Sequence, residues 1–254
     1  MSLAVITRSK RLTKTLFAHL NLCSLSIRWI KHEFCTLSNR LHSPNASMSS
    51  PQHERVCPDY LEASDSNTEE ILSKDMLVHK DFISEEEEHH LLEEMIPYLS
   101  RLRYEYAHWD NAIHGYRETE RKHWTARNKV ILERVKQFAF PPTVSALAYV
   151  HILDLAEDGY IKPHIDAVRF CGDTIAGLSL LSPCVMRLVN DKDKMKFANI
   201  LLQPRSLYIM KDRARYEYTH EVLPGHSSVF KGQNVPKTRR ISVICRNEPE
   251  EIDP

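Results

Sequence analysis

One short pattern, a histidine followed two residues later by an aspartate, occurs three times in the sequence. The copies are His79-Lys80-Asp81, His108-Trp109-Asp110 and His164-Ile165-Asp166. In an extended strand, side chains two residues apart project from the same face, so such a pair can offer two ligands to one metal ion. A chain with 14 histidines also produces this pattern by chance. The neighbouring sequence must therefore distinguish the copies.

The third copy is the one with the context of a metal site. It follows the segment AYVHILDL, which predicts a strand, and the glycine-containing turn AEDGYIKP. It is expected to open a new strand over 166–171. The first copy precedes an acidic helix, where Asp81 suits a turn or a helix cap. The second lies in a polar stretch without strand character. We therefore take His164 and Asp166 as metal ligands.

A third ligand is supplied downstream by His220, near the end of the segment ARYEYTHEV. Two neutral imidazoles and one carboxylate occupy one face of Fe(II) and leave the other positions free for a chelating 2-oxo acid and O2. The pattern therefore predicts an iron-dependent dioxygenase whose metal is held by His164, Asp166 and His220. A structural histidine is the alternative for His220, and His226, in a loop rich in glycine and serine, is a second candidate ligand.

Two arginines near the C-terminus suit the carboxylates of a 2-oxoglutarate cosubstrate. Arg240 begins an apolar strand, and Arg246 lies six residues later on the same face. Arginine binds carboxylates bidentately and stays charged when buried, and a bound dicarboxylate would offset the cost of burying it. Tyr208, within SLYIM, is placed to donate a hydrogen bond to the same carboxylate. The alternatives are that Arg240 pairs with an acidic side chain or lies at an exposed edge, and that Tyr208 only packs.

The elements that must position these residues begin with two helices. Ser84 and the acids after it predict a helix start, and apolar residues recur at helical spacing up to Leu99. A second helix is predicted from about Thr119 to Phe138, before two prolines. Residues 40–67, rich in Ser, Pro, Asn and Asp, are predicted to be a linker.

From Thr143 the sequence consists of short apolar segments separated by turn residues, with no helical pattern between them. Strands are predicted at 145–155, 166–171, 174–181, 184–190, 197–202, 206–211, 215–222 and 239–246. This indicates a mainly β fold with N-terminal helices, a double-stranded β-helix of the jelly-roll or cupin-like kind. The predicted dioxygenase domain spans 54–254, with a helical layer at about 68–140 and the β-helix at about 143–248.

The first 53 residues predict a mitochondrial transit peptide and a disordered linker. They contain seven basic residues and one acid, whereas the rest of the chain contains 27 basic and 33 acidic residues. Segments rich in Arg, Lys, Ser and Leu and poor in acids are typical of such peptides. A disordered basic tail is the alternative. The six cysteines have no regular spacing, which favours a reducing compartment such as the mitochondrial matrix. No segment is apolar enough to predict a membrane span.

These motifs resemble the AlkB family of Fe(II)- and 2-oxoglutarate-dependent dioxygenases. The Arg-x5-Arg spacing of Arg240 and Arg246 is typical of AlkB proteins, and GYIKPHID and TIAGLSLLSPCVMRLV add to a resemblance over about residues 75–248. The resemblance implies that Arg240 and Tyr208 hold the distal carboxylate of 2-oxoglutarate. It implies that Arg246 supports the other end of the cosubstrate and the ligand Asp166.

The sequence departs from the nucleic-acid-repairing members of that family. Leu153 and Leu155 stand where those members carry Asn and Tyr, and no segment suits a base-flipping lid. Trp109 and Tyr116 are candidate stacking aromatics but suit a core equally.

The acidic balance after residue 53 favours a protein substrate over RNA or DNA, although a local cluster of basic residues weakens this argument. That cluster consists of Arg101, Arg103, Arg117, Arg121, Lys122, Arg127 and Lys129. A non-catalytic interaction protein is a further alternative, and the oligomeric state is not predicted.

Overall fold

The structure is a computed structural model that describes residues 57–106 and 112–249. The predicted transit peptide therefore lies outside the described residues. The helices are α1 (Ser66–Asp75), α2 (Glu85–Leu99), α3 (Ala126–Ala139) and α4 (Asp212–Tyr216). The strands are β1 (Leu61–Ala63), β2 (Met76–His79), β3 (Ile113–Arg121), β4 (Val150–His164), β5 (Thr174–Leu180), β6 (Cys184–Asn190), β7 (Phe197–Leu202), β8 (Ser206–Lys211), β9 (Tyr218–Val222), β10 (Val229–Phe230), β11 (Gln233–Asn234) and β12 (Arg240–Arg246). None of the described helices has the length and apolar character needed to cross a bilayer.

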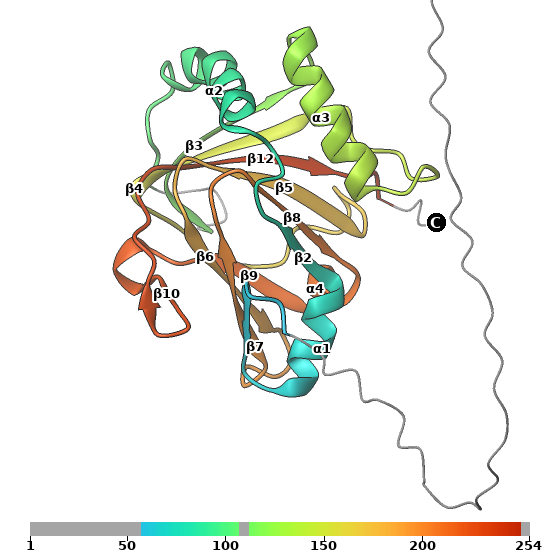
Figure 1. Ribbon diagram of the computed structural model, residues 1–254, viewed down its shortest axis with the longest axis vertical. Helices are drawn as coiled ribbons and strands as arrows, with labels where there is room; N and C mark the ends of the chain where they lie inside the picture. The colour runs from blue at the N-terminus through green and yellow to red at the C-terminus, as the bar shows by residue number, and fades with distance from the viewer. Residues whose placement is uncertain (1–56, 107–111, 250–254) are drawn as a thin grey trace, which may run out of the picture. The chain divides into compact units, whose positions relative to one another are not determined.

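An antiparallel sheet of ten strands runs in the order β1-β7-β6-β9-β4-β12-β5-β8-β2, with β3 added to β4 (Figure 1). The long strand β4 belongs to both halves of this curled sheet. Its first part pairs with β12, where Leu155 opposes Arg240, and its last residue, His164, opposes His220 of β9. The predicted double-stranded β-helix is confirmed. Its strand order brings the end of β4 beside β9, although the two are distant in sequence.

The β3–β4 pair changes register where two glycines touch. The shift lies between His114 and Tyr116, and Gly115 has a φ of +63°, which favours glycine. A Cβ on Gly159 would lie 2.4 Å from the carbonyl oxygen of Gly115. Close backbone contact is therefore possible only without side chains at these two positions. The predicted turn AEDG is part of the continuous strand β4 rather than a break between two strands.

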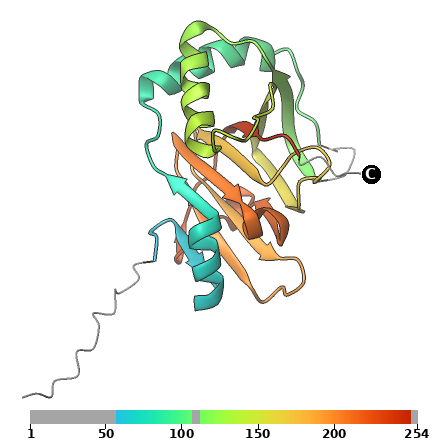
Figure 2. The same ribbon diagram turned by 90° about the vertical axis from the view of Figure 1, so that its right-hand side faces the viewer.

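Strand alternation separates an inner face from an outer face. On β12, Ile241, Val243 and Cys245 belong to the core beneath the helices, whereas Ile244 belongs to the core inside the curled sheet. Helices α2 and α3 cover the outer face side by side (Figures 1 and 2). The α2 start has the capping box that its sequence predicts, with Ser84 and Glu87 bonding reciprocally. Arg240 and Arg246 therefore start on the inner face by alternation.

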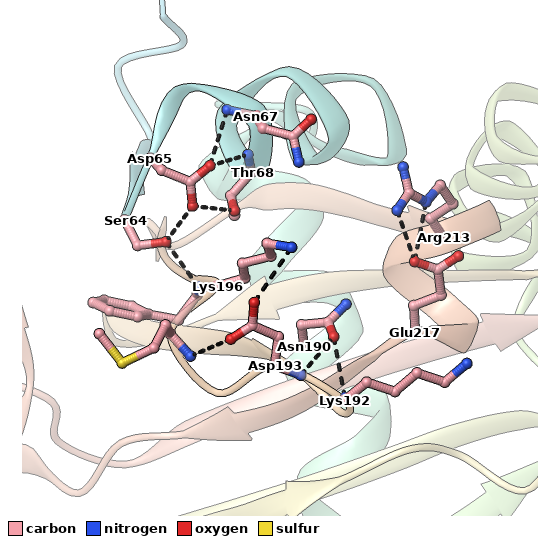
Figure 3. Close-up of polar contacts among 12 residues, drawn as sticks. Ser64, Asp65, Asn67, Thr68, Asn190, Lys192, Asp193, Lys196, Arg213 and Glu217 are labelled. Carbon is pink, nitrogen blue, oxygen red and sulfur yellow. Dashed lines mark hydrogen bonds and ion pairs between the residues drawn. The ribbon is translucent and has the colours of Figure 1, made fainter.

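The predicted linker 40–67 is wrong at its end, because β1 and the start of α1 lie within it. Asp65 caps α1 by accepting from the backbone N–H groups of Asn67 and Thr68. The Ser64 hydroxyl accepts from the backbone N–H of Phe197 at 3.0 Å, so this start is tied to β7 (Figure 3). The polar residues that suggested a linker are cap and turn residues of an ordered segment.

Three other predicted elements need correction. The second helix starts at Ala126, not near Thr119, because residues 119–121 pair with β4 as the end of β3, and Thr125 supplies the cap. Residues 166–171 form no strand, so the metal motif ends a strand instead of opening one. The predicted strand 215–222 begins inside helix α4 and is β9 only from Tyr218. The predicted helical layer also contains β2 and β3, which join the sheet.

Candidate metal centre

The three predicted ligands converge at one point of the inner face. His164 and His220 are register partners on β4 and β9, and Asp166 lies two residues beyond the end of β4. Their ligand atoms all lie within 4.8 Å of one another. The Asp166 Oδ1 atom is 3.3 Å from His164 Nε2 and 3.7 Å from His220 Nε2. Three donors at this spacing match a facial set of two imidazoles and one carboxylate.

The first His-x-Asp copy contributes nothing to this cluster. Asp81 lies in a turn with a φ of +47°, is largely exposed and approaches Arg205 at 3.5 Å. This agrees with the turn that its sequence predicts. The copy His108-Trp109-Asp110 lies outside the described residues. His226 lies in a 3-10 turn lining a different cavity, of about 790 Å³, and is not part of the ligand group.

Both imidazoles direct Nε2 toward the cluster. His164 Nδ1 lies 2.9 Å from the carbonyl oxygen of Lys162. A carbonyl only accepts, so Nδ1 donates this hydrogen bond, and Nε2 is the nitrogen that faces Asp166. Burial and then the neighbouring His164 lower the pKa of His220 to about 3, so His220 is neutral at physiological pH. Neutral imidazoles are the form that binds a divalent metal.

Arg246 fixes the carboxylate of Asp166. Its Nε donates to Asp166 Oδ2 at 3.0 Å and its Nη2 lies 2.9 Å from the same oxygen, which leaves Oδ1 facing the two imidazoles. Burial by itself raises the pKa of Asp166, but the hydrogen bond from His164 and the charge of Arg246 outweigh it and hold the pKa well below its usual range. Asp166 is therefore an ionised carboxylate whose Oδ1 faces the two imidazoles.

The surroundings of Arg240 fit a bound dicarboxylate. Its side chain is 1% exposed and donates through Nε to Ser179 Oγ at 3.1 Å, but no acid contacts it in the described part of the chain. Its Nη2 atom is buried without a hydrogen-bond partner. An orphaned buried guanidinium is costly unless an anion completes it. Of the two alternatives for Arg240, neither an acidic partner among the described residues nor an exposed edge is found.

Tyr208 lies beside this arginine on the inner face. It is buried and opposes Gly177 of β5, where a Cβ would lie 2.4 Å from the phenol oxygen. Burial raises the pKa of Tyr208, and the charge of Arg240 acts in the opposite direction. The phenol is therefore protonated and within electrostatic reach of Arg240. The donor set as a whole fits a metal ion and 2-oxoglutarate.

Two supporting residues, Gly177 and Ser179, were not singled out from the sequence. A glycine inside the apolar strand TIAGLSL is a recognisable signal of close approach by another group. Ser179 has no comparable signal, because serine is common in strands and its partner, Arg240, is 61 residues away. Leu153, Leu155 and Tyr116 are buried core residues, as the sequence left open for Tyr116.

Comparison with known families defines the class of protein. The family profile of the 2OG-Fe(II) oxygenase superfamily matches residues 75–246, so the chain belongs to that superfamily. It is an enzyme of the 2-oxoglutarate-dependent dioxygenase class, whose members use Fe(II), 2-oxoglutarate and O2.

Within that class, the chain belongs to the AlkB homolog 7 family. It is 51% identical over 195 residues to the mouse protein "Alpha-ketoglutarate-dependent dioxygenase alkB homolog 7, mitochondrial", covering 77% of this chain and 88% of the mouse one. The bovine protein of the same name is 51% identical over 178 residues, 70% of this chain and 80% of its own. The resemblance to AlkB proteins predicted from the sequence is confirmed.

Solved structures show the same fold at low sequence identity. OsALKBH1 superposes with a TM-score of 0.51 at 12% identity and covers 68% of this chain and 97% of its own. A prolyl hydroxylase from Trichoplax adhaerens, in complex with a peptide fragment of hypoxia inducible factor, gives a TM-score of 0.51 at 9% identity and covers 74% and 90%. At such identities the likeness concerns the fold alone.

Proposed function

We propose that His164, Asp166 and His220 hold Fe(II) and that the enzyme hydroxylates a protein side chain in the mitochondrial matrix. Tyr208 and Arg240 hold the distal carboxylate of 2-oxoglutarate in this proposal, and Arg246 orients Asp166 and supports the other end of the cosubstrate. The observation that carries it is the convergence of three ligand atoms within 4.8 Å on the inner face of the sheet that also holds Arg240, a buried arginine with no acidic partner among the described residues.

The residues of the chain have distinct tasks in this reaction. Fe(II) with 2-oxoglutarate and O2 supplies an oxidant that hydroxylates a C–H bond, with release of succinate and CO2. The Lys162 carbonyl orients the His164 ring, and Arg246 holds Asp166 Oδ2 away from the metal position. The apolar inner face around Leu153 and Leu155 excludes water from the cosubstrate.

Ion pairs between arginines of the basic cluster and acids of the same chain support a protein substrate. Arg117 donates to the buried carboxylate of Asp154 at 2.8 Å, and Arg121 pairs with Glu94 at 2.9 Å. These arginines are neutralised within the fold, which reduces the charge available to a phosphate backbone. The mitochondrial names of the mouse and bovine relatives support the predicted destination.

N-demethylation of mitochondrial RNA or DNA bases is the second candidate, and one cavity favours it. This cavity, of about 210 Å³, is lined by Lys122, Lys129 and Lys136 beside Trp124. Within the described part of the chain none of the three lysines forms an ion pair. Lys136 donates to the carbonyl oxygen of Leu147 at 3.4 Å, and Glu133 also lines the cavity. Lys122 and Lys129 are therefore the two cations that suit an anionic group such as a phosphate.

Isotope labelling distinguishes the two candidates. Mitochondrial extract from cells lacking the enzyme is incubated with the full-length protein, Fe(II), 2-oxoglutarate and ¹⁸O2, with His164→Ala as the inactive control. Peptides that gain one ¹⁸O atom only with the active enzyme support side-chain hydroxylation. Loss of methyl groups from nucleosides without labelled peptides contradicts it, and the double variant Lys122→Glu, Lys129→Glu should then reduce that loss.

Targeting is tested separately. Residues 1–53 fused to a fluorescent reporter should enter mitochondria and become resistant to protease after rupture of the outer membrane. A reporter that stays in the cytosol, or is digested after rupture, contradicts the matrix assignment.

A further inference from the structure

Arg246 makes a third contact, on the side away from the metal ligands. Its Nη1 atom lies 3.3 Å from Nδ1 of His151, and Nε2 of that ring lies 2.9 Å from Oε2 of Glu118. Glu118 is on β3, His151 on β4 and Arg246 on β12. Three neighbouring strands thus contribute a row of polar side chains that ends at the carboxylate of Asp166.

The row lies on the inner face of the sheet. His151 precedes Leu153 and Leu155 by two and four residues, and both leucines belong to the inner core. Its register partner on β12 is Ile244, two residues before Arg246. The sequence offers no signal for this role, because His151 lies inside the strand segment AYVHILDL and its partners are distant.

The chemistry of the donors fixes the tautomer of His151. A guanidinium group has only N–H donors, so Nδ1 must accept from Arg246 with its lone pair. The ring proton is then on Nε2, which donates to the carboxylate of Glu118. Each link of the row has one donor and one acceptor, so the orientation of Arg246 is defined from both sides.

We propose that His151 is a positioning residue that holds Arg246 on Asp166, and that Glu118 in turn orients the ring of His151. This inference rests on the proposed roles of Asp166 and Arg246. Arginine has many rotamers, and a third fixed contact reduces the entropy lost when Nε and Nη2 both bind Oδ2. With Oδ2 occupied, Oδ1 stays directed at the two imidazoles.

Two matched substitutions of His151 test the roles of its two ring nitrogens separately. The amide oxygen of His151→Asn occupies the place of Nδ1 and can accept from Arg246. The amide of His151→Gln reaches the place of Nε2, where its NH2 group can donate to Glu118, and leaves Nη1 without an acceptor. The full-length variants are titrated anaerobically with 2-oxoglutarate at saturating Fe(II), and the visible charge-transfer band of the chelate is followed. Substitution of such supporting groups typically weakens binding about 10–100-fold. We expect a loss of that size in Gln and a smaller loss in Asn, which keeps the acceptor for Arg246 but not the contact with Glu118.

The same titration separates this inference from the proposed site. If the wild type gives no band, or His164→Ala keeps it, the proposed site fails. If the wild type gives the band and the Gln variant binds 2-oxoglutarate as tightly as the wild type, the role of His151 is refuted. Equal losses in Asn and Gln also refute it, because the Nδ1 acceptor would then not be the feature that matters.

Glu118→Ala provides a second variant whose folding is less at risk. The Glu118 side chain is 35% exposed and lies on β3, which pairs with β4 at the edge of the sheet. Glu118→Ala should weaken 2-oxoglutarate binding, as His151→Gln does, but by a smaller factor. The melting temperature of the metal-free protein should not change. An affinity equal to that of the wild type overturns the role of Glu118.

Discussion

Replacing Arg240 by methionine should separate cosubstrate binding from folding stability. The guanidinium is 1% exposed, has no acidic partner in the described residues and leaves Nη2 without a hydrogen bond. An unpaired buried ion costs several kcal/mol, and a methionine of similar length removes that cost. We therefore expect the free Arg240→Met protein to be at least as stable as the wild type.

The ligand-induced stabilisation should disappear in the same variant. At a free 2-oxoglutarate concentration of about 100 times Kd, binding stabilises the folded wild type by about 2.7 kcal/mol. For a domain of this size, each kcal/mol raises Tm by about 2–4 °C, so the wild type should shift by roughly 5–11 °C. Arg240→Met should show almost no shift when thermal unfolding is followed anaerobically with Fe(II), with and without 2-oxoglutarate.

The neighbouring Arg239 provides a matched control with the opposite behaviour. Its guanidinium donates to both carboxylate oxygens of the buried Asp154, at 3.0 and 2.9 Å. Arg239→Met removes one partner of the buried Asp154 carboxylate, which Arg117 still contacts. It should therefore lower the stability of the free protein, but 2-oxoglutarate should still raise its Tm. If Arg240→Met shifts like the wild type, or is the less stable of the two variants, our account of the pocket is refuted.

Three further predictions concern other parts of the structure. Gly177→Ala places a methyl group 2.4 Å from the Tyr208 phenol, so it should lower the unfolding free energy by about 1–3 kcal/mol and weaken 2-oxoglutarate binding. A 2-oxoglutarate affinity equal to that of the wild type would contradict this packing of Gly177 against Tyr208. Glu94→Ala removes the acceptor shared by Arg121, Thr125 and Asn128, and should cost about 2–4 kcal/mol in denaturant unfolding with unchanged 2-oxoglutarate affinity. The pKa of His220 is lowered in the folded protein, so below about pH 6.5 the unfolded chain binds a proton that the folded chain does not, and the stability of the metal-free protein falls as the pH drops toward 3. His220→Asn should make this dependence of stability on pH less steep. An unchanged dependence would show that His220 is not buried as described.

The candidate metal ligands were predictable because their chemistry limits the choice of residues. His164, Asp166 and His220 follow from spacing and order along the chain, and Arg240 and Arg246 follow from strand alternation. What could not be predicted depends on pairing between strands distant in sequence. Residues 119–121 continued a helical pattern but pair with β4, and the contact of His151 with Arg246 spans 95 residues.

The fold class was predictable for a similar reason. Short apolar segments without intervening helices indicate an antiparallel β structure whatever its exact strand order. The continuity of β4 through AEDG was missed because glycine and acids usually mark a turn. Here Gly159 allows close contact with Gly115 of β3, and the strand passes from one half of the sheet to the other.

The measurement that tests the central claim most directly is the anaerobic titration of the full-length protein with Fe(II) and 2-oxoglutarate. The account predicts a weak visible charge-transfer band with one iron per chain, and its absence in His164→Ala. A well-folded wild type that binds no iron and shows no band would contradict the assignment of His164, Asp166 and His220 as the metal site.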